Sequence, residues 1–262
     1  MPEGLEAEIY RRVAATCVGR RIRRAQVDHN QTEAPALEWS LPGASITDAR
    51  RHGKLVLVDL LGADGEDFVL GLHFGMTGRL VVDGASAIER LEYSSHRDDP
   101  AWDRLLVEFE DGGVLRVNDP RRWAKFTLMP DSSRLGPDVL SITRHDLTIA
   151  LRGRARALKA VLLDQTVIAG FGNLCVDEVL WHAALDPHRP GGLVSRRDVG
   201  RLWRATVTEL PAMLQRGGSH TGTIDPQLRT VGGRCPKPRC RGVLQRSVVG
   251  GRTTVWCPKH QL

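Results

Sequence analysis

The chain has no apolar run that approaches the roughly 20 residues a helix needs to cross a membrane. Its opening, MPEGLEAEIYRR, lacks the basic start, apolar stretch and small-residue cleavage site of a secretory signal peptide. Aromatic residues make up only 5%, yet apolar residues reach 41%, which is enough for a real core. We therefore expect a cytoplasmic protein without a membrane partner, whose 262 residues form one large domain or two medium ones.

The cysteines do not provide a disulfide framework. There are five, an odd number, and Cys17 and Cys175 are isolated. This predicts a reducing compartment and a metal site. Two close ligand pairs separated by a short loop, which a tetrahedral zinc site requires, occur as Cys235-x4-Cys240-x16-Cys257-x2-His260. Four protein ligands leave no position for water, so we expect one structural Zn²⁺; the alternative is three unrelated thiols and a surface histidine.

Acidic residues are missing from the end of the chain. No Asp or Glu occurs in residues 231–262, whereas seven basic residues do: Arg234, Lys237, Arg239, Arg241, Arg246, Arg252 and Lys259. The whole chain carries a net charge of +6. A basic tail that is also structured is typical of a phosphate-binding surface, so an anionic partner is expected.

The first half of the chain has the pattern of an antiparallel sheet protein. Residues 3–18 have helical spacing and Gly19 ends that segment. Turn signals separate short apolar runs, and EDGG at 110–113 predicts a hairpin. The polar stretch 86–101 predicts a surface loop. The remaining runs, at 54–62, 68–82, 104–119 and 124–129, indicate a sandwich or barrel.

The second half has helical periodicity. PDSSRLGPD at 130–138 is the candidate linker, and no internal repeat is present. Helices are expected at 144–152, 154–164, 173–183 and 195–215, followed by a hairpin that carries the cysteines. The expected domains are 1–129, a helical domain 139–228 and a zinc finger 229–262.

Six segments together resemble the formamidopyrimidine-DNA glycosylase / endonuclease VIII family of base-excision repair enzymes. In the family's order they are MPEG at the start, RHGKLVLV (51–58), HFGMTGRL (73–80), NDPRRWAKF (118–126), LKAVLLDQTVIAGFGNLCVDEVLW (158–181) and GGRTTVWCPKHQ (250–261). The resemblance implies an α+β multidomain fold: an N-terminal antiparallel β-sandwich with flanking helices, a C-terminal helix–two-turn–helix domain and a zinc-finger β-hairpin. It also implies binding of damaged double-stranded DNA in the cleft between the domains, by a monomer.

The resemblance assigns the chemistry to the start of the chain. Removal of Met1 would expose the secondary amine of Pro2, the family's nucleophile, which attacks C1′ and forms an imine with the opened sugar. Glu3 is the expected general acid and base, and Glu6 supports it. Taken alone, both glutamates could simply complement the start of a helix. Lys54 matches the lysine that holds a phosphate next to the lesion, although it could also be a solvated lysine.

The resemblance also provides the DNA contacts. His73, Asn173 and Arg252 match residues that grip the flanking phosphates; by position alone, Asn173 would be a helix N-cap. The residues that fill the gap left by the extruded base are Met76, Arg121 and Trp123. Met76 could alternatively belong to the core. Trp123 replaces the family's usual phenylalanine.

The expected activity is bifunctional: excision of a damaged base, then strand cleavage by β- and δ-elimination. Segment 216–235 is shorter than in members specific for oxidised guanine, so oxidised pyrimidines, ring-opened purines and abasic sites are the expected substrates. Ser219, His220 and Thr221 could contact the base. Alternatives are a catalytically silent damaged-DNA binding protein of this fold and an RNA-binding module.

Overall fold

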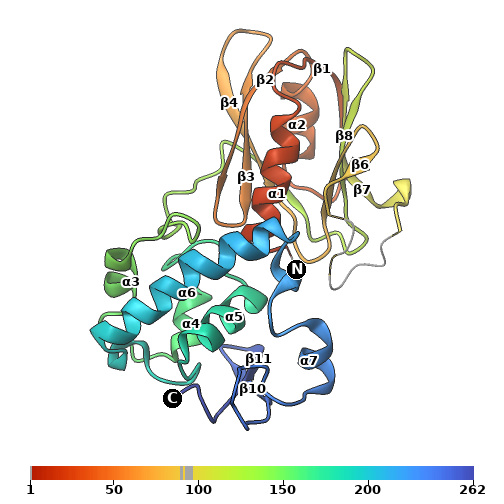
Figure 1. Ribbon diagram of the computed structural model, residues 1–262. Helices are drawn as coiled ribbons and strands as arrows, with labels where there is room; N and C mark the ends of the chain where they lie inside the picture. Colours follow the sequence, from red (N-terminus) through yellow and green to blue (C-terminus); the bar gives the residue numbers. More distant parts are fainter. Residues whose placement is uncertain (1, 89–90, 92–96) are drawn as a thin grey trace. The chain divides into compact units, whose positions relative to one another are not determined.

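The computed structural model describes residues 2–88, 91 and 97–262 (Figure 1). The first half contains α1 (Gly4–Ala15), β1 (Ile22–Val27), α2 (Ala34–Ser40), β2 (Ser45–His52), β3 (Leu55–Leu61), β4 (Asp67–His73), β5 (Arg79–Val82), β6 (Ala85–Ser86), the short 3-10 helix η1 (Pro100–Trp102), β7 (Asp103–Phe109), β8 (Val114–Asn118) and β9 (Lys125–Leu128). The second half contains α3 (Arg144–Leu151), α4 (Leu158–Leu162), α5 (Asn173–Ala183), η2 (Gly191–Leu193), α6 (Arg196–Gln215), η3 (Ser219–Thr221), α7 (Pro226–Val231), β10 (Gln245–Val249) and β11 (Arg252–Trp256). No helix in the described part of the chain is long and apolar enough to span a membrane.

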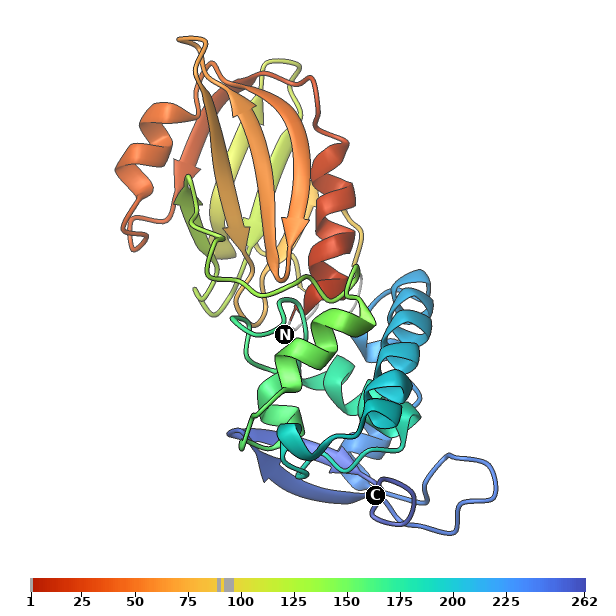
Figure 2. The ribbon, with the colours of Figure 1, turned by 90° about the vertical axis from the view of Figure 1, so that its left-hand side faces the viewer.

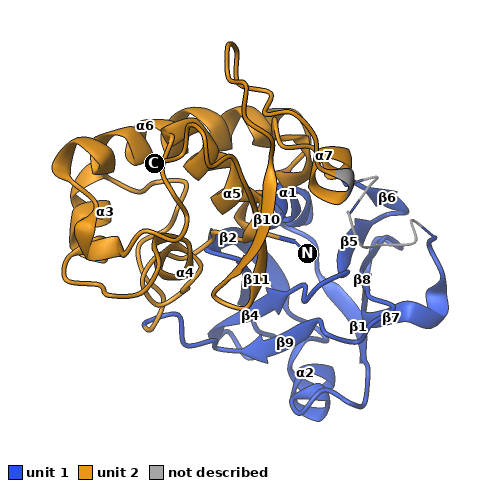
Figure 3. Ribbon diagram, turned by 90° about the horizontal axis from the view of Figure 1, so that it is seen from below, with its two compact units in different colours: residues 1–2, 6–133 blue, residues 3–5, 134–262 orange. Residues whose placement is uncertain are grey.

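The chain forms two compact units, coloured separately in Figure 3. Unit 1 comprises residues 1–2 and 6–133, and unit 2 comprises residues 3–5 and 134–262. The main change of unit therefore falls inside the segment 130–138 that contains two prolines. Residues Glu3–Leu5 are a separate short contribution to unit 2, because Leu5 joins the hydrophobic core of that unit.

Unit 1 is the predicted antiparallel β-sandwich. One sheet has the strand order β2-β3-β4-β9 and the other the order β1-β7-β8-β5-β6, and every pairing is antiparallel. Figure 2 shows the two sheets face to face. A single core cluster takes residues from both sheets, among them Leu60, Leu72 and Leu105. Apolar side chains alternate along strands such as β7, so each sheet buries one face in that shared core.

Several local expectations for unit 1 are confirmed and others are wrong. The hairpin at 110–113 joins β7 and β8. The helix expected over 3–18 ends earlier, at Ala15, and tight turns continue to Gly19, whose φ is +87°. Helix α2 was not predicted, although Pro35 occupies a first-turn position that suits proline. Residues 89–90 and 92–96 of the loop expected at 86–101 lie outside the described residues; β6 and η1 occupy its two ends.

Unit 2 is helical, and a β-hairpin follows its helices. Helix α5 has the predicted bounds, and α6 begins one residue later than expected because Ser195 caps it by accepting from the Asp198 N–H. The helix expected over 154–164 is limited to α4. Ala157 forms a β-bridge with Pro190, and Leu158 N–H donates to the Arg189 carbonyl, so the preceding backbone is extended. The hairpin β10–β11 is confirmed.

A buried charge cluster joins the helices of unit 2 to its hairpin. Lys159 Nζ lies 2.6 Å from Asp177 Oδ1 and donates to the Thr253 carbonyl at 3.0 Å. Asp177 Oδ2 accepts from Arg229 Nη2 at 2.6 Å and from Val255 N–H at 3.1 Å. Burial lowers the pKa of the Lys159 ammonium, and Asp177 counteracts this in part. One carboxylate therefore connects α4, α5, α7 and β11.

Replacing Asp177 should be costly, because Lys159 and Arg229 would be left as buried cations without their anion. We expect Asp177→Asn to lower the free energy of unfolding by about 3–5 kcal/mol. Asp164→Asn is the matched control, since its partner Arg156 is 52% exposed, and it should cost under about 1 kcal/mol. Denaturant unfolding followed by circular dichroism measures both values. Equal losses would show that the cluster is not a special determinant of stability.

Candidate functional site

Glu3 caps helix α5 from the other end of the sequence. The N-cap residue of α5 is Gly172, which has no side chain. Instead, Glu3 Oε1 accepts from Leu174 N–H at 2.8 Å and Oε2 accepts from Cys175 N–H at 3.0 Å. A carboxylate is stabilised there because the first turn of a helix presents unpaired N–H groups and a partial positive charge. Glu3 is 1% exposed, so it is held at one point on unit 2.

The backbone near this cap explains two glycines. Gly4 N–H donates to the Gly170 carbonyl at 2.8 Å, and a Cβ on Gly4 would also lie only 2.8 Å from that oxygen, so this close approach requires a glycine. A Cβ built on Gly172 would lie 2.1 Å from Glu3 Cδ, so only glycine leaves room for the carboxylate. The Gly-Phe-Gly stretch before α5 thus leaves space for the side chain of Glu3, which is distant in sequence.

Asn173 is the first residue of α5, and the N-cap interpretation of it is wrong. Gly172 holds the cap position and the Glu3 side chain makes the capping bonds. The Asn173 Oδ1 atom is buried and has no hydrogen-bond partner among the described residues. The Asn173 amide therefore stands at the start of the helix without a capping function, where its side chain could turn to a ligand.

A basic cluster lies at one end of three neighbouring strands in unit 1. His73 of β4 is paired with Leu55 of β3 on one side and with Lys125 of β9 on the other, and Lys54 directly precedes Leu55. Burial lowers the pKa of His73, and the charges of Lys54 and Lys125 lower it further. Gly75 N–H donates to His73 Nδ1 at 3.2 Å, so the neutral ring carries its proton on Nε2 and can donate it to an anion.

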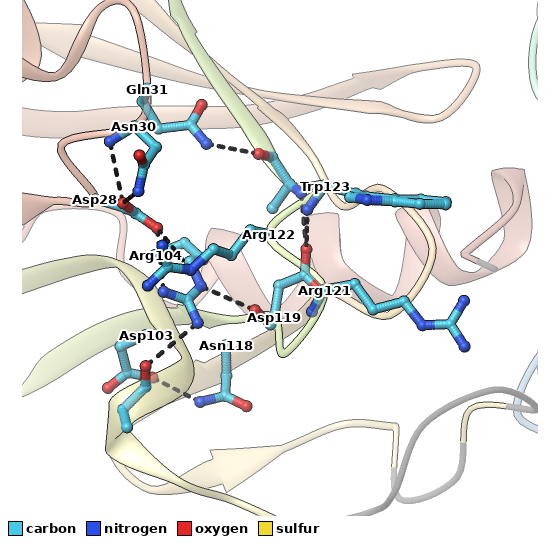
Figure 4. Close-up of polar contacts among 12 residues, drawn as sticks. Asp28, Asn30, Gln31, Asp103, Arg104, Asn118, Asp119, Arg121, Arg122 and Trp123 are labelled. Atoms are coloured by element: carbon cyan, nitrogen blue, oxygen red, sulfur yellow. Dashed lines mark hydrogen bonds and ion pairs between the residues drawn. The ribbon is translucent and has the colours of Figure 1, made fainter.

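Arg121 and Trp123 extend from a loop organised by one buried carboxylate, as Figure 4 shows. Asp119 accepts from the Trp123 N–H at 2.7 Å and from the Ala124 N–H at 2.8 Å. Its other oxygen accepts from Arg121 N–H at 3.1 Å and from the hydroxyl of Thr77, the residue after Met76. The Arg121 and Trp123 side chains point to the same side in Figure 4, and Trp123 is 54% exposed.

The remaining predicted residues occupy distinct places. Pro2 is buried and belongs to unit 1, whereas its neighbour Glu3 belongs to unit 2. Glu6 is buried in the first turn of α1, close to Tyr10: burial raises the pKa of that phenol, and the charge of Glu6 raises it further. Arg252 is exposed at the first position of β11, directly after the turn at Gly250 and Gly251, and is paired with Val249.

The four predicted metal ligands converge. One donor atom from each of Cys235, Cys240, Cys257 and His260 lies within 4.8 Å of all the others. Burial lowers the pKa of His260, which keeps its imidazole neutral, and its Nδ1 atom lies 3.4 Å from the Cys235 sulfur. Burial raises the pKa of the Cys235 thiol to about 11 when no cation is bound. Three sulfurs and one neutral imidazole can hold a metal ion.

Trp181 of α5 supports the cluster at two points. Its indole N–H donates to the Cys235 sulfur at 3.4 Å, and its carbonyl lies 3.1 Å from His260 Nε2. An outer hydrogen bond of this kind fixes the ring orientation and leaves Nδ1 as the ligand atom. The sequence pattern predicted the four ligands but not this tryptophan, since nothing in its spacing distinguishes it from a core residue.

Segment 216–235 forms η3 and α7. Glu178 of α5 is 2% exposed and accepts from Thr223 N–H at 2.6 Å and from Ile224 N–H at 3.0 Å. Its carboxylate therefore fastens the backbone that follows η3. Within η3, Ser219 is buried, whereas His220 and Thr221 are partly exposed. The sequence pattern did not predict roles for Glu178, Asp119 or Asp177, because buried acids have no periodicity of their own.

Comparison with known proteins identifies the family. Residues 1–126 match the formamidopyrimidine-DNA glycosylase N-terminal domain, and residues 135–225 match the formamidopyrimidine-DNA glycosylase H2TH domain. The chain is 33% identical over 294 residues to the formamidopyrimidine-DNA glycosylase of Paracoccus denitrificans (strain Pd 1222), covering 100% of each protein. It is 34% identical over 285 residues to that of Xanthomonas campestris pv. campestris (strain B100), again covering 100% of each.

A solved structure agrees over the same length. A complex between a mutant of the Lactococcus lactis FPG protein and a Fapy-dG containing DNA has a TM-score of 0.81, with 26% sequence identity and 99% of each chain covered. The fold and the matched domains define a DNA glycosylase of base-excision repair. Within that class, the chain belongs to the formamidopyrimidine-DNA glycosylase family, as its motifs predicted.

The metal cluster makes a prediction about His260. His260→Ala removes one of the four donors, and we expect metal affinity to fall by more than the about 10–100-fold typical of an outer-shell change. His145→Ala is the control, because His145 is exposed on α3 and outside the cluster. Competition with a chromophoric chelator gives both affinities. Equal affinities would mean that three thiols alone hold the ion.

His73 gives a prediction about pH. The pKa of His73 in the folded protein lies below its ordinary value of about 6.5. As pH falls below about 6.5, His73 therefore takes up a proton in the unfolded chain before it does so in the folded protein. This difference lowers the free energy of unfolding, until the pH is low enough to protonate His73 in the folded protein as well. Removing one positive neighbour with Lys125→Gln should raise the His73 pKa by less than burial depresses it.

Proton NMR titration of the histidine rings measures this change. Arg23→Gln is the control, since Arg23 is exposed and pairs with Glu108 on the other sheet. An unchanged His73 pKa in Lys125→Gln would show that burial alone sets it.

Proposed function

We propose that the protein is a bifunctional DNA glycosylase and abasic-site lyase whose nucleophile is the Pro2 amine. The observation that carries this proposal is the pair of hydrogen bonds that fixes Glu3: each of its two carboxylate oxygens accepts a backbone N–H of α5. Consecutive Cα atoms are about 3.8 Å apart, so fixing Glu3 also restricts Pro2. A nucleophile with little freedom has less entropy to lose when it meets its substrate.

The proposed reaction begins with a chain whose Met1 has been removed. The Pro2 nitrogen bonds to C1′, the glycosidic bond breaks, and the base leaves with the electron pair and takes up a proton. Opening of the sugar ring turns the adduct into an iminium ion. Loss of a proton from C2′ then expels the 3′ oxygen, and a second elimination expels the 5′ oxygen. Hydrolysis of the remaining imine returns the free amine.

Glu3 is the proposed proton carrier of these steps. A carboxylate can accept and release a proton, and the bonds to α5 fix where the Glu3 carboxylate lies. Glu3 would protonate the ring oxygen as the sugar opens and later move the sugar protons. Glu6, buried one turn along α1, would support the same end of the helix.

The proposed DNA contacts come from both units. Lys54 and the Nε2–H of His73 would hold phosphates from unit 1, and Asn173 and Arg252 would hold phosphates from unit 2. Met76, Arg121 and Trp123 would fill the space left by the extruded base. We infer that the cluster of three cysteines and His260 holds zinc, which would stabilise the hairpin that carries Arg252 and take no part in the reaction.

The proposed substrates follow from relatives and from segment 216–235. Solved complexes of the Lactococcus lactis protein contain Fapy-dG, an oxidized pyrimidine or an abasic site. We propose ring-opened purines, oxidised pyrimidines and abasic sites for this chain. Excision of 8-oxoguanine should be less efficient, because segment 216–235 is folded into η3 and α7 and leaves no long loop to cover a flipped base. The protein would act as a monomer in the cytoplasm.

Borohydride trapping on abasic duplex DNA tests the proposal. Wild-type protein should form a covalent adduct, because reduction of the imine makes the bond to deoxyribose permanent. Insertion of a glutamate between Met1 and Pro2 would retain the initiator and block the amine, so adduct formation should fall by about a hundredfold or more. Pro2→Gly keeps a free amine and is the matched control.

Two outcomes would contradict the proposal. A blocked protein that nicks abasic DNA at the wild-type rate would exclude the terminal amine as nucleophile. Tight binding to the duplex without any adduct in the wild type would support the alternative, a catalytically silent damaged-DNA binding protein.

A further inference from the structure

Asp119 makes an unusual set of contacts for a fully buried acid. It is 0% exposed, and its side chain accepts four hydrogen bonds: from Thr77 Oγ1 and from the backbone N–H groups of Arg121, Trp123 and Ala124. Burying a carboxylate is costly unless such bonds compensate for lost water. Three of the four donors belong to the loop that presents Arg121 and Trp123, and the fourth belongs to the turn that presents Met76.

The same loop is braced at both of its ends. Arg104 Nε donates to the Asp119 carbonyl at 2.9 Å, and the Arg104 guanidinium is itself fixed by Asp28 at 3.1 Å. At the other end, Gln31 Nε2 donates to the Ala124 carbonyl at 2.8 Å. Figure 4 shows these contacts on the side of the loop opposite to the Trp123 ring. The loop backbone is therefore fixed by Asp119 and by the contacts of Arg104 and Gln31, while the side chains of Arg121 and Trp123 stay exposed.

The turn that contains Met76 is in direct contact with this loop. A Cβ on Gly75 would lie 2.6 Å from the Trp123 carbonyl carbon, so the two backbones approach as closely as a glycine allows. The turn is also fixed from the core side, where the buried Tyr10 hydroxyl donates to the Gly78 carbonyl at 3.1 Å. Met76 and Trp123 are thus carried by two segments that Asp119 and Gly75 lock together.

We propose that Asp119 is a positioning residue that sets the three intercalating side chains, Met76, Arg121 and Trp123, in one arrangement before DNA binds. The inference rests on the proposed function and deepens it, because it explains how an exposed wedge can be rigid. A wedge that is already ordered loses less conformational entropy when it replaces a stacked base. Without Asp119, that ordering would have to occur at the moment of base extrusion.

Asp119→Asn is the primary test. An amide nitrogen cannot accept a hydrogen bond, so the two donors on one carboxylate oxygen would lose their acceptor. These are either the Trp123 and Ala124 N–H groups, or the Arg121 N–H and the Thr77 hydroxyl. We expect kcat/KM on a duplex lesion to fall by about tenfold to a hundredfold. Adduct formation with a single-stranded abasic oligonucleotide should stay within about twofold, because no stacked base is displaced there. The duplex to single-strand ratio is the quantity measured.

A second variant and a control keep the test decisive if Asp119→Asn folds poorly. Thr77→Val removes only the hydroxyl donor and leaves three backbone donors on Asp119, so the ratio should fall less but in the same direction. Asp59→Asn is the matched control on the four-stranded sheet, where Asp59 pairs with the half-exposed Arg50, and its ratio should equal the wild-type value. Thermal unfolding of each variant confirms that the fold is retained.

A fluorescence measurement separates this proposal from the proposed reaction. A duplex with 2-aminopurine opposite an abasic analogue reports unstacking on binding without any bond being formed. Wild type and Asp59→Asn should raise the fluorescence, and Asp119→Asn and Thr77→Val should raise it less at saturating protein. This readout still decides the role of Asp119 if no adduct forms. Unchanged fluorescence and an unchanged duplex to single-strand ratio in both loop variants would overturn the proposal.

Discussion

The bond between the Glu3 carboxylate and the start of α5 is the constraint on which the rest of the structure depends. It joins the first residues of the chain to a helix 171 positions further on, through the Leu174 N–H. It also replaces the capping side chain that Gly172 cannot supply, so the helix and the chain terminus stabilise each other. The chemistry proposed for Pro2 needs this coupling, because an unrestrained terminus would sample many positions.

Unit 2 fastens its hairpin in two independent ways. Asp177 holds β11 from the helix side through the Val255 N–H, and the cysteine and histidine cluster holds the far end. Trp181 lies on the same helix as Asp177 and touches the cluster through both its indole and its carbonyl. Helix α5 therefore serves three sites at once: the Glu3 cap at its start, Asp177 in its middle and the metal ligands near its end. One helix of eleven residues therefore connects the Glu3 cap with the hairpin inside unit 2.

The sequence predicted those features that depend on local periodicity or on short spacing. Helix α5 has the bounds that its pattern indicates, and the β7–β8 hairpin forms at its Gly-Gly turn, because neighbours in the chain decide both. The four metal donors were predictable for the same reason. Helix α2 was missed because only seven residues form it, which is too short a stretch to show a period.

Other features depend on partners that are distant in sequence. Helix α4 is shorter than its pattern because residues near Pro190 pair with the backbone before it. The capping of α5 could not be predicted from the sequence. Asparagine is a preferred N-cap residue, so the local sequence favours Asn173 as the cap, and nothing near it indicates that a distant glutamate makes the capping bonds. Asp119 was visible only as part of a family motif, and three of its four hydrogen bonds come from a loop conformation in which Arg122 has a φ of +58°. Tertiary contacts of this kind cannot be predicted from the pattern of any one segment of the sequence.

The membership of Glu3–Leu5 in unit 2 bears on how such a protein can be taken apart. A fragment that begins at Arg134 would contain every helix of the H2TH region and the four predicted metal ligands. Its helix α5 would have no capping side chain, because Gly172 cannot supply one, and its core would lack Leu5. The carboxyl-terminal half by itself would therefore lack the cap of its central helix and one side chain of its core, both of which come from residues 3–5.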